Sequence, residues 1–251
     1  MIIYFAGMQP YPYFTPIARN VLSSYILPSK RILERKANGD IDKLMIDSGA
    51  FTFFAEAGFT TKRLKTSKTP NIDDYIHEYC RYLVTHRKLI DYYIELDIDK
   101  VVGWDKVLEL RHVFDTYNLA PIYVWHPTLP IPFEDFCKKY DYFGVGTSTK
   151  SAEILTRMLE TAQKHKSKIH IFGFTRANDL LKMAKYKSLE SVDSTSWCGS
   201  KYGRLFGGIH NMTKSWQGAY SKDLNHRKIN KLNIIKWKQF EMRLNSIQQG
   251  S

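Results

Sequence analysis

Short apolar runs alternate with helical patterns along most of this chain of 251 residues, and this alternation limits the fold more than any other feature. The runs are rich in β-branched and aromatic residues and are followed by turn residues, which is typical of buried strands. We predict strands at Ile2 to Ala6, Lys43 to Asp47, Tyr92 to Asp97, Pro121 to His126, Tyr142 to Gly146, Lys168 to Phe172 and Leu189 to Asp193, with a weaker candidate at Arg204 to Ile209. Strands that alternate with helices form a parallel sheet, and about eight such units close into a barrel.

Several of the remaining segments have the spacing of apolar residues that is expected of an α-helix. They are Asp73 to Lys88, Trp104 to Tyr117, Ser151 to Lys166 and Ala177 to Lys185. Asn71 precedes the first of them and is followed by acids, as an N-cap is. The segment from His226 to Arg243 mixes basic with apolar residues and predicts a basic amphipathic helix. We therefore predict a single-domain α/β fold, a TIM-type (β/α)8 barrel over residues 1–225, with a C-terminal helix (residues 226–251) packed on it.

The composition predicts a soluble protein of the cytoplasm. The chain has no apolar stretch near the roughly 20 residues that span a bilayer, and its N-terminal segment predicts a strand, not a signal peptide. The three cysteines, Cys80, Cys137 and Cys198, are too scattered for a disulfide framework or a zinc site. We therefore expect no structural metal and no membrane contact.

A marked excess of basic residues predicts a polyanionic partner. Lys and Arg number 37 against 25 Asp and Glu, the formal net charge is +12, and the pI is about 9.4. Such a balance is typical of proteins that bind nucleic acid. A lysine-rich surface encoded by an AT-rich genome explains the same balance and stays open as an alternative. Local clusters, at Lys62 to Lys68 and on the C-terminal helix, favour phosphate binding.

Three aspartates, Asp47, Asp97 and Asp193, stand at the C-terminal ends of predicted strands. The carboxyl ends of parallel barrel strands meet on one face, where the active sites of such barrels are built. A lone Asp at such a place commonly caps a helix or begins a turn, and that alternative stays open for each residue taken alone. Three together predict a site, and His126, at the end of another run, is a further candidate for it.

The residue types at these strand ends suit a purine and an attack on its sugar. Gly144, Gly146 and Gly173 would let a planar ligand approach the backbone. Phe51 and Trp197 offer rings that stack on a base, although each is equally well explained as a core residue. An ionised carboxylate accepts hydrogen bonds from the N–H edge of guanine. A further carboxylate can attack a sugar carbon and hold a covalent intermediate.

The segment Ile46-Asp47-Ser48-Gly49-Ala50-Phe51 is similar to the DSGGFQ motif of the tRNA-guanine transglycosylase superfamily. Shorter segments resemble other motifs of that family: Glu95 to Asp97 its base-recognising strand, Ile169 to Phe174 a strand that ends in a glycine turn, and Glu190 to Ser194 its nucleophile strand. Their order and approximate spacing agree over residues 40–200. The first motif is fairly specific, and the others are short.

The resemblance implies a TIM barrel that exchanges guanine for a 7-deazaguanine base without breaking the sugar–phosphate backbone. Asp193 would be the nucleophile at C1′, Asp47 the general acid and base, and Asp97 the residue that binds the Watson–Crick edge. The other implied substrate-binding residues are Ser48, Gly49, Phe51, Gly144, Gly146, Gly173, Trp197 and His126, the last standing where the family has a base-contacting Gln. The family mechanism uses neither a metal nor a cofactor at the reacting centre.

Departures from the family pattern narrow the expected substrate. The tRNA enzymes carry three cysteines and a histidine for zinc after the nucleophile, whereas this chain has only Cys198 there, and Thr195-Ser196-Trp197 replaces Pro-Thr-Arg. The short, basic, zinc-free chain most resembles the 7-deazaguanine DNA transglycosylases of bacteria and phages. The expected partners are therefore double-stranded DNA, whose target base is flipped out, and a free 7-deazaguanine base, in the cytoplasm of a bacterium or of a phage-infected host.

Three alternatives stay open. A metal-dependent barrel nuclease or phosphohydrolase would use Asp47, Asp97, Asp193 and His126 as ligands of a hard cation. A tRNA-acting homologue would carry out the same base exchange on tRNA instead of DNA. A catalytically inert barrel would only bind nucleic acid. Both a monomer and a homodimer are compatible with the sequence.

Overall fold

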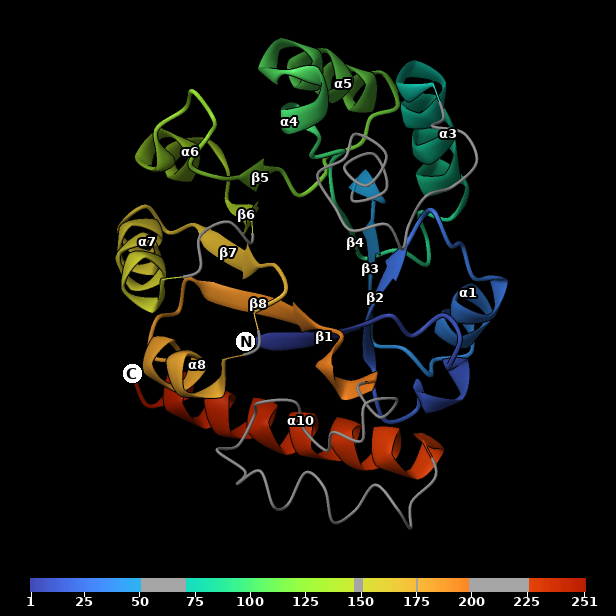
Figure 1. The fold of residues 1–251 in the computed structure, drawn as a ribbon, viewed down its shortest axis with the longest axis vertical. Coiled ribbons are helices and arrows are strands. Elements are labelled where there is room, and N and C mark those ends of the chain that lie inside the picture. Colours follow the sequence, from blue (N-terminus) through green and yellow to red (C-terminus); the bar gives the residue numbers. More distant parts are fainter. Residues whose placement is uncertain (51–70, 147–150, 175, 199–225) are drawn as a thin grey trace.

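The computed structural model describes residues 1–50, 71–146, 151–174, 176–198 and 226–251. Eight strands, all paired in parallel, form one curled sheet in the order β4-β3-β2-β1-β8-β7-β6-β5 (Figure 1). They are β1 (Ile2–Ala6), β2 (Asn20–Ser24), β3 (Lys43–Asp47), β4 (Tyr92–Tyr93), β5 (Val124–Trp125), β6 (Tyr142–Val145), β7 (Lys168–Ile171) and β8 (Leu189–Ser194). A single parallel bridge between Ile94 and Ile122 joins the two ends of the sheet. The predicted α/β fold of TIM-barrel type is confirmed.

Helices follow the strands along the chain, as a (β/α) barrel requires. They are α1 (Lys30–Ala37), α3 (Ile72–Thr85), α4 (Asp99–Val102), α5 (Trp104–Thr116), α6 (Phe133–Lys139), α7 (Ala152–Lys164), α8 (Ala177–Met183) and α10 (His226–Gln249), while a 3-10 turn, η1 (Pro12–Phe14), follows β1. The predicted N-cap is confirmed, because the Asn71 side chain accepts from the backbone N–H groups of Asp73 and Asp74. Helices α1, α4 and α6 were not predicted.

The eighth strand of the barrel differs from the one predicted. It is β2, which lies between β1 and β3, whereas Arg204 to Ile209 falls outside the described residues. Only Val21 and Leu22 are apolar in β2, and two serines follow, so the segment lacks the long apolar run by which strands are recognised. Its neighbours on both sides provide the partners that make it a strand.

A buried ion pair closes the barrel where its strands are shortest. Glu95 follows β4, and its carboxylate accepts the backbone N–H of Val124 in β5 at 2.6 Å. The same carboxylate binds the Arg111 guanidinium through two contacts of 2.6 Å. That guanidinium lies 4.7 Å from the ring centroids of both Trp104 and Tyr123. A side chain thus supplies the hydrogen bond that a longer strand would have made.

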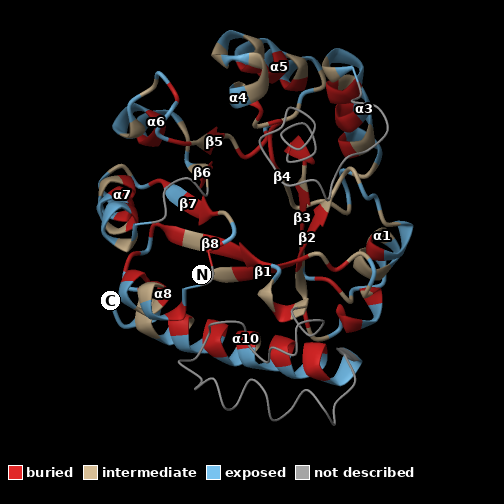
Figure 2. Ribbon diagram, in the orientation of Figure 1, coloured by how far each residue is buried: buried red, intermediate tan, exposed pale blue. Residues whose placement is uncertain are grey.

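Two apolar clusters lie on opposite sides of the sheet. The larger fills the space between the strands and the outer helices, and Figure 2 shows buried residues along the strands and on the helix sides that point toward them. The smaller cluster fills the barrel interior and includes Tyr4, Leu22, Met45, Ile94 and Val124. Side chains alternate between the two faces of a strand. Two positions beyond the interior residue Met45, Asp47 therefore points into the carboxyl end of the barrel.

Helix α10 packs on the barrel. It contacts β1 and α8 and runs beneath β8 and β1 in Figure 1. Trp237 is fully buried in the same cluster as the strands. The amino group of Met1 donates to Asn245 and Gln248, and the backbone N–H of Ile3 donates to Glu241. The end of α10 therefore lies at the amino end of the barrel, and its beginning lies toward the carboxyl end. Among the helices that the structure describes, none is long and apolar enough to cross a membrane.

Candidate functional site at the carboxyl end of the barrel

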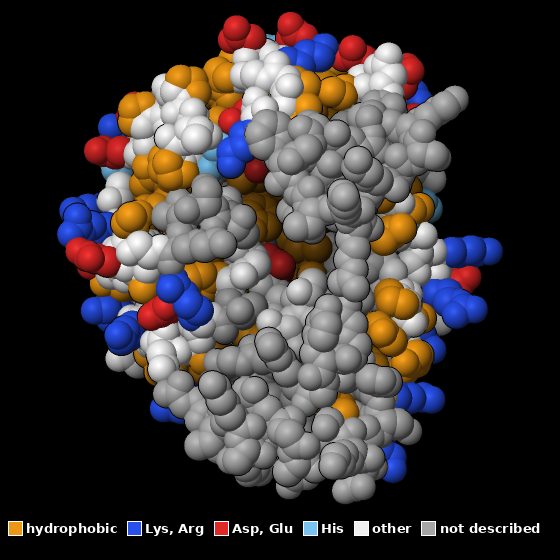
Figure 3. Space-filling model, in the orientation of Figure 1, with side chains coloured by type: hydrophobic (Ala, Val, Ile, Leu, Met, Phe, Trp, Pro, Cys, Tyr) orange, Lys and Arg blue, Asp and Glu red, His pale blue; other side chains and the backbone are white. Residues whose placement is uncertain are grey.

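The carboxyl end of the barrel carries two groups of acids. In the space-filling view a hollow near the middle of the molecule shows acidic and apolar atoms inside it (Figure 3). We call Asp47 and Asp193 the acid pair, and Asp97, Asp99 and His126 the histidine–acid cluster. The acid pair belongs to β3 and β8, whereas the residues of the cluster follow β4 and β5, and both groups lie where the barrel strands end.

Asp47, the last residue of β3, is a carboxyl group with a strongly altered affinity for protons. Burial and the negative charges of Asp193 and Asp97 raise its pKa to about 6, although hydrogen bonds from the Gly49 backbone and the Ser24 side chain oppose the change. Charges act on one another in this way only over short distances. The structure thus brings together the three aspartates that the sequence singled out, from three different strand ends.

Asp193 lies on β8 and is almost completely buried. Its Oδ1 accepts the backbone N–H of Gly173 at 2.7 Å. The Nε2 atom of His170, a fully buried residue of β7, lies 3.3 Å from the same oxygen. Gly173 has a φ of 57°, a region that favours glycine, so this residue lets the chain turn its N–H toward Asp193.

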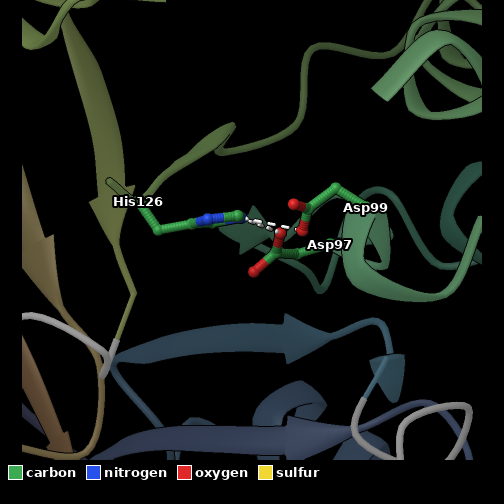
Figure 4. Close-up of side chains that lie close together, drawn as sticks. All are labelled: Asp97, Asp99 and His126. Carbon is green, nitrogen blue, oxygen red and sulfur yellow. Dashed lines mark hydrogen bonds and ion pairs between the residues drawn. The ribbon is translucent and has the colours of Figure 1, made fainter. Parts of the chain in front are cut away.

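The histidine–acid cluster joins β5 to the segment that follows β4. His126 Nε2 lies 3.1 Å from Asp97 Oδ1 and 3.0 Å from Asp99 Oδ1 (Figure 4). The Thr128 hydroxyl is 2.7 Å from the other ring nitrogen, Nδ1. Burial alone would lower the pKa of His126, but the hydrogen bonds and charges of the two aspartates outweigh it and raise that pKa to about 9. His126 is therefore an imidazolium at neutral pH.

The same cluster has the composition of a divalent-cation site. One possible ligand atom from each of Asp97, Asp99 and His126 lies within 4.8 Å of the others. Carboxylate oxygens with one imidazole nitrogen suit Mn²⁺, Zn²⁺ or Mg²⁺ more than a soft metal. Asp99 was missed in the sequence, although its position two residues after Asp97 was a usable signal. The prediction that the reaction needs no metal stays a prediction.

Three of the predicted glycines are explained by packing. A Cβ on Gly144 would lie 2.4 Å from the ring of Phe172, so that ring occupies the space that we expected a ligand to use. A Cβ on Gly146 would lie 3.4 Å from the Cβ of His126. Gly49 has a φ of +81° and would meet the Ile26 side chain at 2.7 Å. These glycines shape the walls of the site, and the expected contact of Gly144 with a base is corrected.

The remaining predicted residues divide between the core and the undescribed part of the chain. Trp197 is fully buried, and its indole N–H donates to the Ala6 carbonyl at 2.7 Å. The expectation that it stacks on a base is therefore wrong. Ser48 is also buried, and its hydroxyl donates to the Glu95 carbonyl. Phe51 lies outside the described residues.

A basic rim lies beside this end of the barrel, at the beginning of α10. We use this name for Arg227, Lys228 and Lys231, which line a groove together with Tyr13 and neighbouring residues of the segment after β1. The Arg227 guanidinium lies 4.4 Å from the centre of the Tyr13 ring. All three basic residues are exposed. The basic face predicted for the C-terminal helix is thus present on the same side as the acids. The cluster at Lys62 to Lys68 lies outside the described residues.

Comparisons with known proteins identify no family for this chain. No family model matches the sequence, and no curated protein matches it. Among solved structures, the chain is similar to the carboxyl transferase domain of Rhizobium etli pyruvate carboxylase, solved with 3-bromopyruvate, at a TM-score of 0.48 and 9% identity. The similarity covers 96% of this chain but only 47% of that one, so the chain spans about half of its length.

Proposed function

We propose that this protein exchanges guanine in DNA for a 7-deazaguanine base through a covalent glycosyl intermediate on Asp193. The observation that carries the proposal is the acid pair: one carboxyl group titrates near pH 6, and a second, close to it, is held by a backbone N–H. A carboxyl group that can give and take a proton, beside a second carboxylate, suits a double displacement at a sugar carbon. The motif resemblance around Asp47 and Asp193 supports the same chemistry.

The two displacements assign a role to each member of the acid pair. The Asp193 carboxylate attacks C1′, the bond between C1′ and the base nitrogen breaks, and its electron pair leaves with guanine. Asp47, in its acid form, gives the leaving guanine a proton. The resulting Asp47 carboxylate then takes a proton from the incoming base, whose nitrogen attacks C1′ and releases Asp193. One base leaves and one enters, so no external oxidant or energy source is required.

The histidine–acid cluster suits recognition of the base in this proposal. His126 lies beside both Asp97 and Asp99, and although burial opposes it, the hydrogen bond and charge of His126 lower the pKa of Asp99. Asp97 is more exposed than Asp99, at 28% against 10% of its side chain. A partly exposed carboxylate can accept the two N–H groups of a guanine edge. We therefore assign base recognition to Asp97 and support of its position to His126.

The basic rim supports DNA as the substrate. Arg227, Lys228 and Lys231 lie at the end of the barrel that holds the acids, where they can bind phosphates on either side of an extruded nucleotide. Binding of this kind is independent of sequence and weakens steeply with salt.

The test is incubation with duplex DNA and a panel of deazapurine bases, followed by mass spectrometry of the released nucleosides. The expected result is a new deazaguanine nucleoside together with free guanine, and a protein–DNA adduct that survives denaturation. Asp115→Asn, a change on the exposed side of α5, is the matched control for Asp193→Asn. If the DNA stays unmodified with every deazapurine base in the panel and no adduct forms, the proposal is rejected.

A second candidate rests on the metal-site composition of the histidine–acid cluster. In that case Asp97, Asp99 and His126 hold a divalent cation that acts on a phosphate ester or another oxygen substrate. Dialysis against a chelator, followed by addition of Mn²⁺ or Mg²⁺, separates the two candidates. Activity that is lost and then restored favours the metal; base exchange that persists in the chelator favours the first proposal.

A further inference from the structure

A line of polar side chains crosses the interior of the barrel beneath Asp193. The Tyr142 hydroxyl of β6 lies 2.7 Å from the Ser191 hydroxyl of β8. That hydroxyl lies 2.6 Å from Nδ1 of His170, whose Nε2 lies 3.3 Å from Asp193 Oδ1. Ser191 and His170 are both fully buried. Buried polar groups of this kind are costly unless each one is paired, so the line has a structural reason to be complete.

One arrangement of protons pairs the hydroxyls of Tyr142 and Ser191 with Nδ1 of His170 and leaves Nε2 without a hydrogen bond. The hydroxyl of Tyr142 donates to Ser191, and the hydroxyl of Ser191 donates to Nδ1 of His170. With Nδ1 as the acceptor, the ring proton lies on Nε2, which is 3.3 Å from Asp193 Oδ1. The aromatic rings of Tyr4 and Phe172 pack edge-on against the imidazole, with centroids at 6.0 and 4.5 Å, and fix its plane. Asp193 is the charged group that faces the imidazole.

The contacts to Asp193 are not shared evenly between its two oxygens. Within the described part of the chain, Oδ1 is the oxygen that meets both the Gly173 N–H and His170 Nε2. The Gly173 N–H fixes the orientation of the carboxylate, and His170 Nε2, which makes no hydrogen bond within the described residues, lies 3.3 Å from the same oxygen.

We propose that His170 is a positioning residue, which with the Gly173 N–H holds Oδ1 of Asp193 so that Oδ2 forms the bond to the sugar. This inference rests on the proposed function. In the covalent intermediate Oδ1 is the carbonyl oxygen of the ester. When the second base attacks, the C1′–Oδ2 bond breaks and the returning negative charge spreads onto Oδ1, where the two donors stabilise it. Ser191 and Tyr142 keep His170 in the tautomer that can donate.

The tautomer can be measured without any activity. In ¹⁵N-labelled protein, the ring nitrogens of His170 are identified by the signals that disappear in His170→Gln. The expected pattern is a neutral imidazole protonated on Nε2, and it should shift in Ser191→Ala. A proton on Nδ1, or an imidazolium at pH 7, would overturn the inference.

Kinetics test the same inference through the rate of adduct formation on DNA. His170→Phe removes both ring nitrogens and should slow the reaction by about 10²-fold, as loss of an oxyanion donor does, with the KM for DNA unchanged. His170→Gln offers an N–H and a carbonyl at similar places and should recover most of the rate. Equal losses in both variants, or a change in KM alone, would show that the residue only fills space.

Ser191→Ala is a second variant, which tests the inference even if His170→Phe does not fold. It removes one hydroxyl and should slow adduct formation about tenfold, the value of a hydrogen bond of roughly 1.4 kcal/mol. A wild-type rate in Ser191→Ala would overturn the role of the line. If the wild-type protein forms neither adduct nor new nucleoside, the proposed function fails. If the wild type is active and His170→Phe is equally active, only this inference fails.

Discussion

The acid pair and the histidine–acid cluster lie at the same end of one barrel, yet they hold their protons in opposite ways. Asp47 has a second acid, Asp193, as its charged neighbour, and its pKa rises to about 6. The two acids of the cluster share an imidazole, and the pKa of that imidazole rises to about 9. At neutral pH Asp47 is therefore close to the exchange of a proton, while His126 stays in its ionised form.

The difference shows what decides the role of a carboxylate at a strand end. A carboxylate without a cationic partner is unstable as an anion in a buried site and becomes a proton carrier. A carboxylate that is paired and more exposed is a fixed acceptor, suited to a ligand N–H or a metal ion. Glu95 is a third case, because its bidentate partner Arg111 converts a buried acid into a structural support. The predictions below test the contrast between the pair and the cluster.

The largest effect is expected from Asp193→Asn. This change removes the proposed nucleophile and should reduce base exchange by at least about 10³-fold. DNA affinity should stay within a factor of about two, because phosphate binding depends on the basic rim. Nucleoside mass spectrometry and fluorescence anisotropy measure the two quantities. An equally large loss of DNA affinity would contradict the assignment of the reaction to the acid pair and of DNA binding to the basic rim.

Asp47→Asn should reduce base exchange by about 10²- to 10⁴-fold, the usual contribution of a general acid or base. In the wild type the step in which Asp47 takes a proton should rise with pH through about 6, the pKa of this carboxyl group. The residual rate of the variant should lack that rise. A pH profile measured with saturating DNA checks the expectation, and an unchanged profile in the variant would assign the rise to another group.

The same Asp47→Asn variant should be more stable than the wild type at high pH. An acid whose pKa is raised from 3.8 to about 6 by folding costs stability only where it is ionised. The cost is absent below pH 4, develops as the pH rises to 6, and amounts to about 3 kcal/mol above it. Urea unfolding of both proteins at pH 4 and pH 8 measures it. A variant that is less stable at pH 8 would place Asp47 among the structural acids.

His126→Gln should show the reverse dependence on pH. A histidine whose pKa is raised from 6.5 to about 9 adds stability that is complete below pH 6.5 and is lost as the pH rises through 9. We expect the variant to be about 2 to 3 kcal/mol less stable at pH 6 and nearly equal to the wild type at pH 10. Urea unfolding at the two pH values measures the difference. Equal destabilisation at both would mean that His126 acts through packing alone.

The smallest effect is expected from Asp97→Asn. The amide keeps the shape but replaces an acceptor oxygen by a donor, so the preference for guanine-like bases over those without an exocyclic amine should fall about tenfold. Competition between two deazapurine bases, followed by nucleoside analysis, gives this ratio directly. An unchanged ratio would move base recognition away from the cluster.

Much of the architecture follows from local patterns. Apolar runs indicated seven of the strands, because a strand buried on both sides needs such a run. Two of them are shorter than predicted, since β4 is only Tyr92–Tyr93 and β5 only Val124–Trp125. The last residues of these runs placed Asp47, Asp97 and Asp193 at one end. Strand β2 was not predicted because two serines follow its short apolar pair. It is nevertheless a strand, because its pairing with β1 and β3 outweighs its own weak sequence pattern.

The roles of individual side chains followed less directly. Trp197 and Gly144 stand beside the motifs, yet the first is enclosed by the core and the second makes room for Phe172. His170 and Ser191 were missed as site residues because each lies within a strand, where a lone polar residue gives no sign of its partner on the next strand.

The sequence by itself determined that this chain forms an alternating α/β barrel and that acids stand at the ends of its strands, because both depend on residue order along the chain. Only the tertiary structure decided that Asp47 has an acid for a neighbour while Asp97 has a histidine. Proton affinity depends on burial and on charges across space, and these are set by which strand ends the closed barrel brings together.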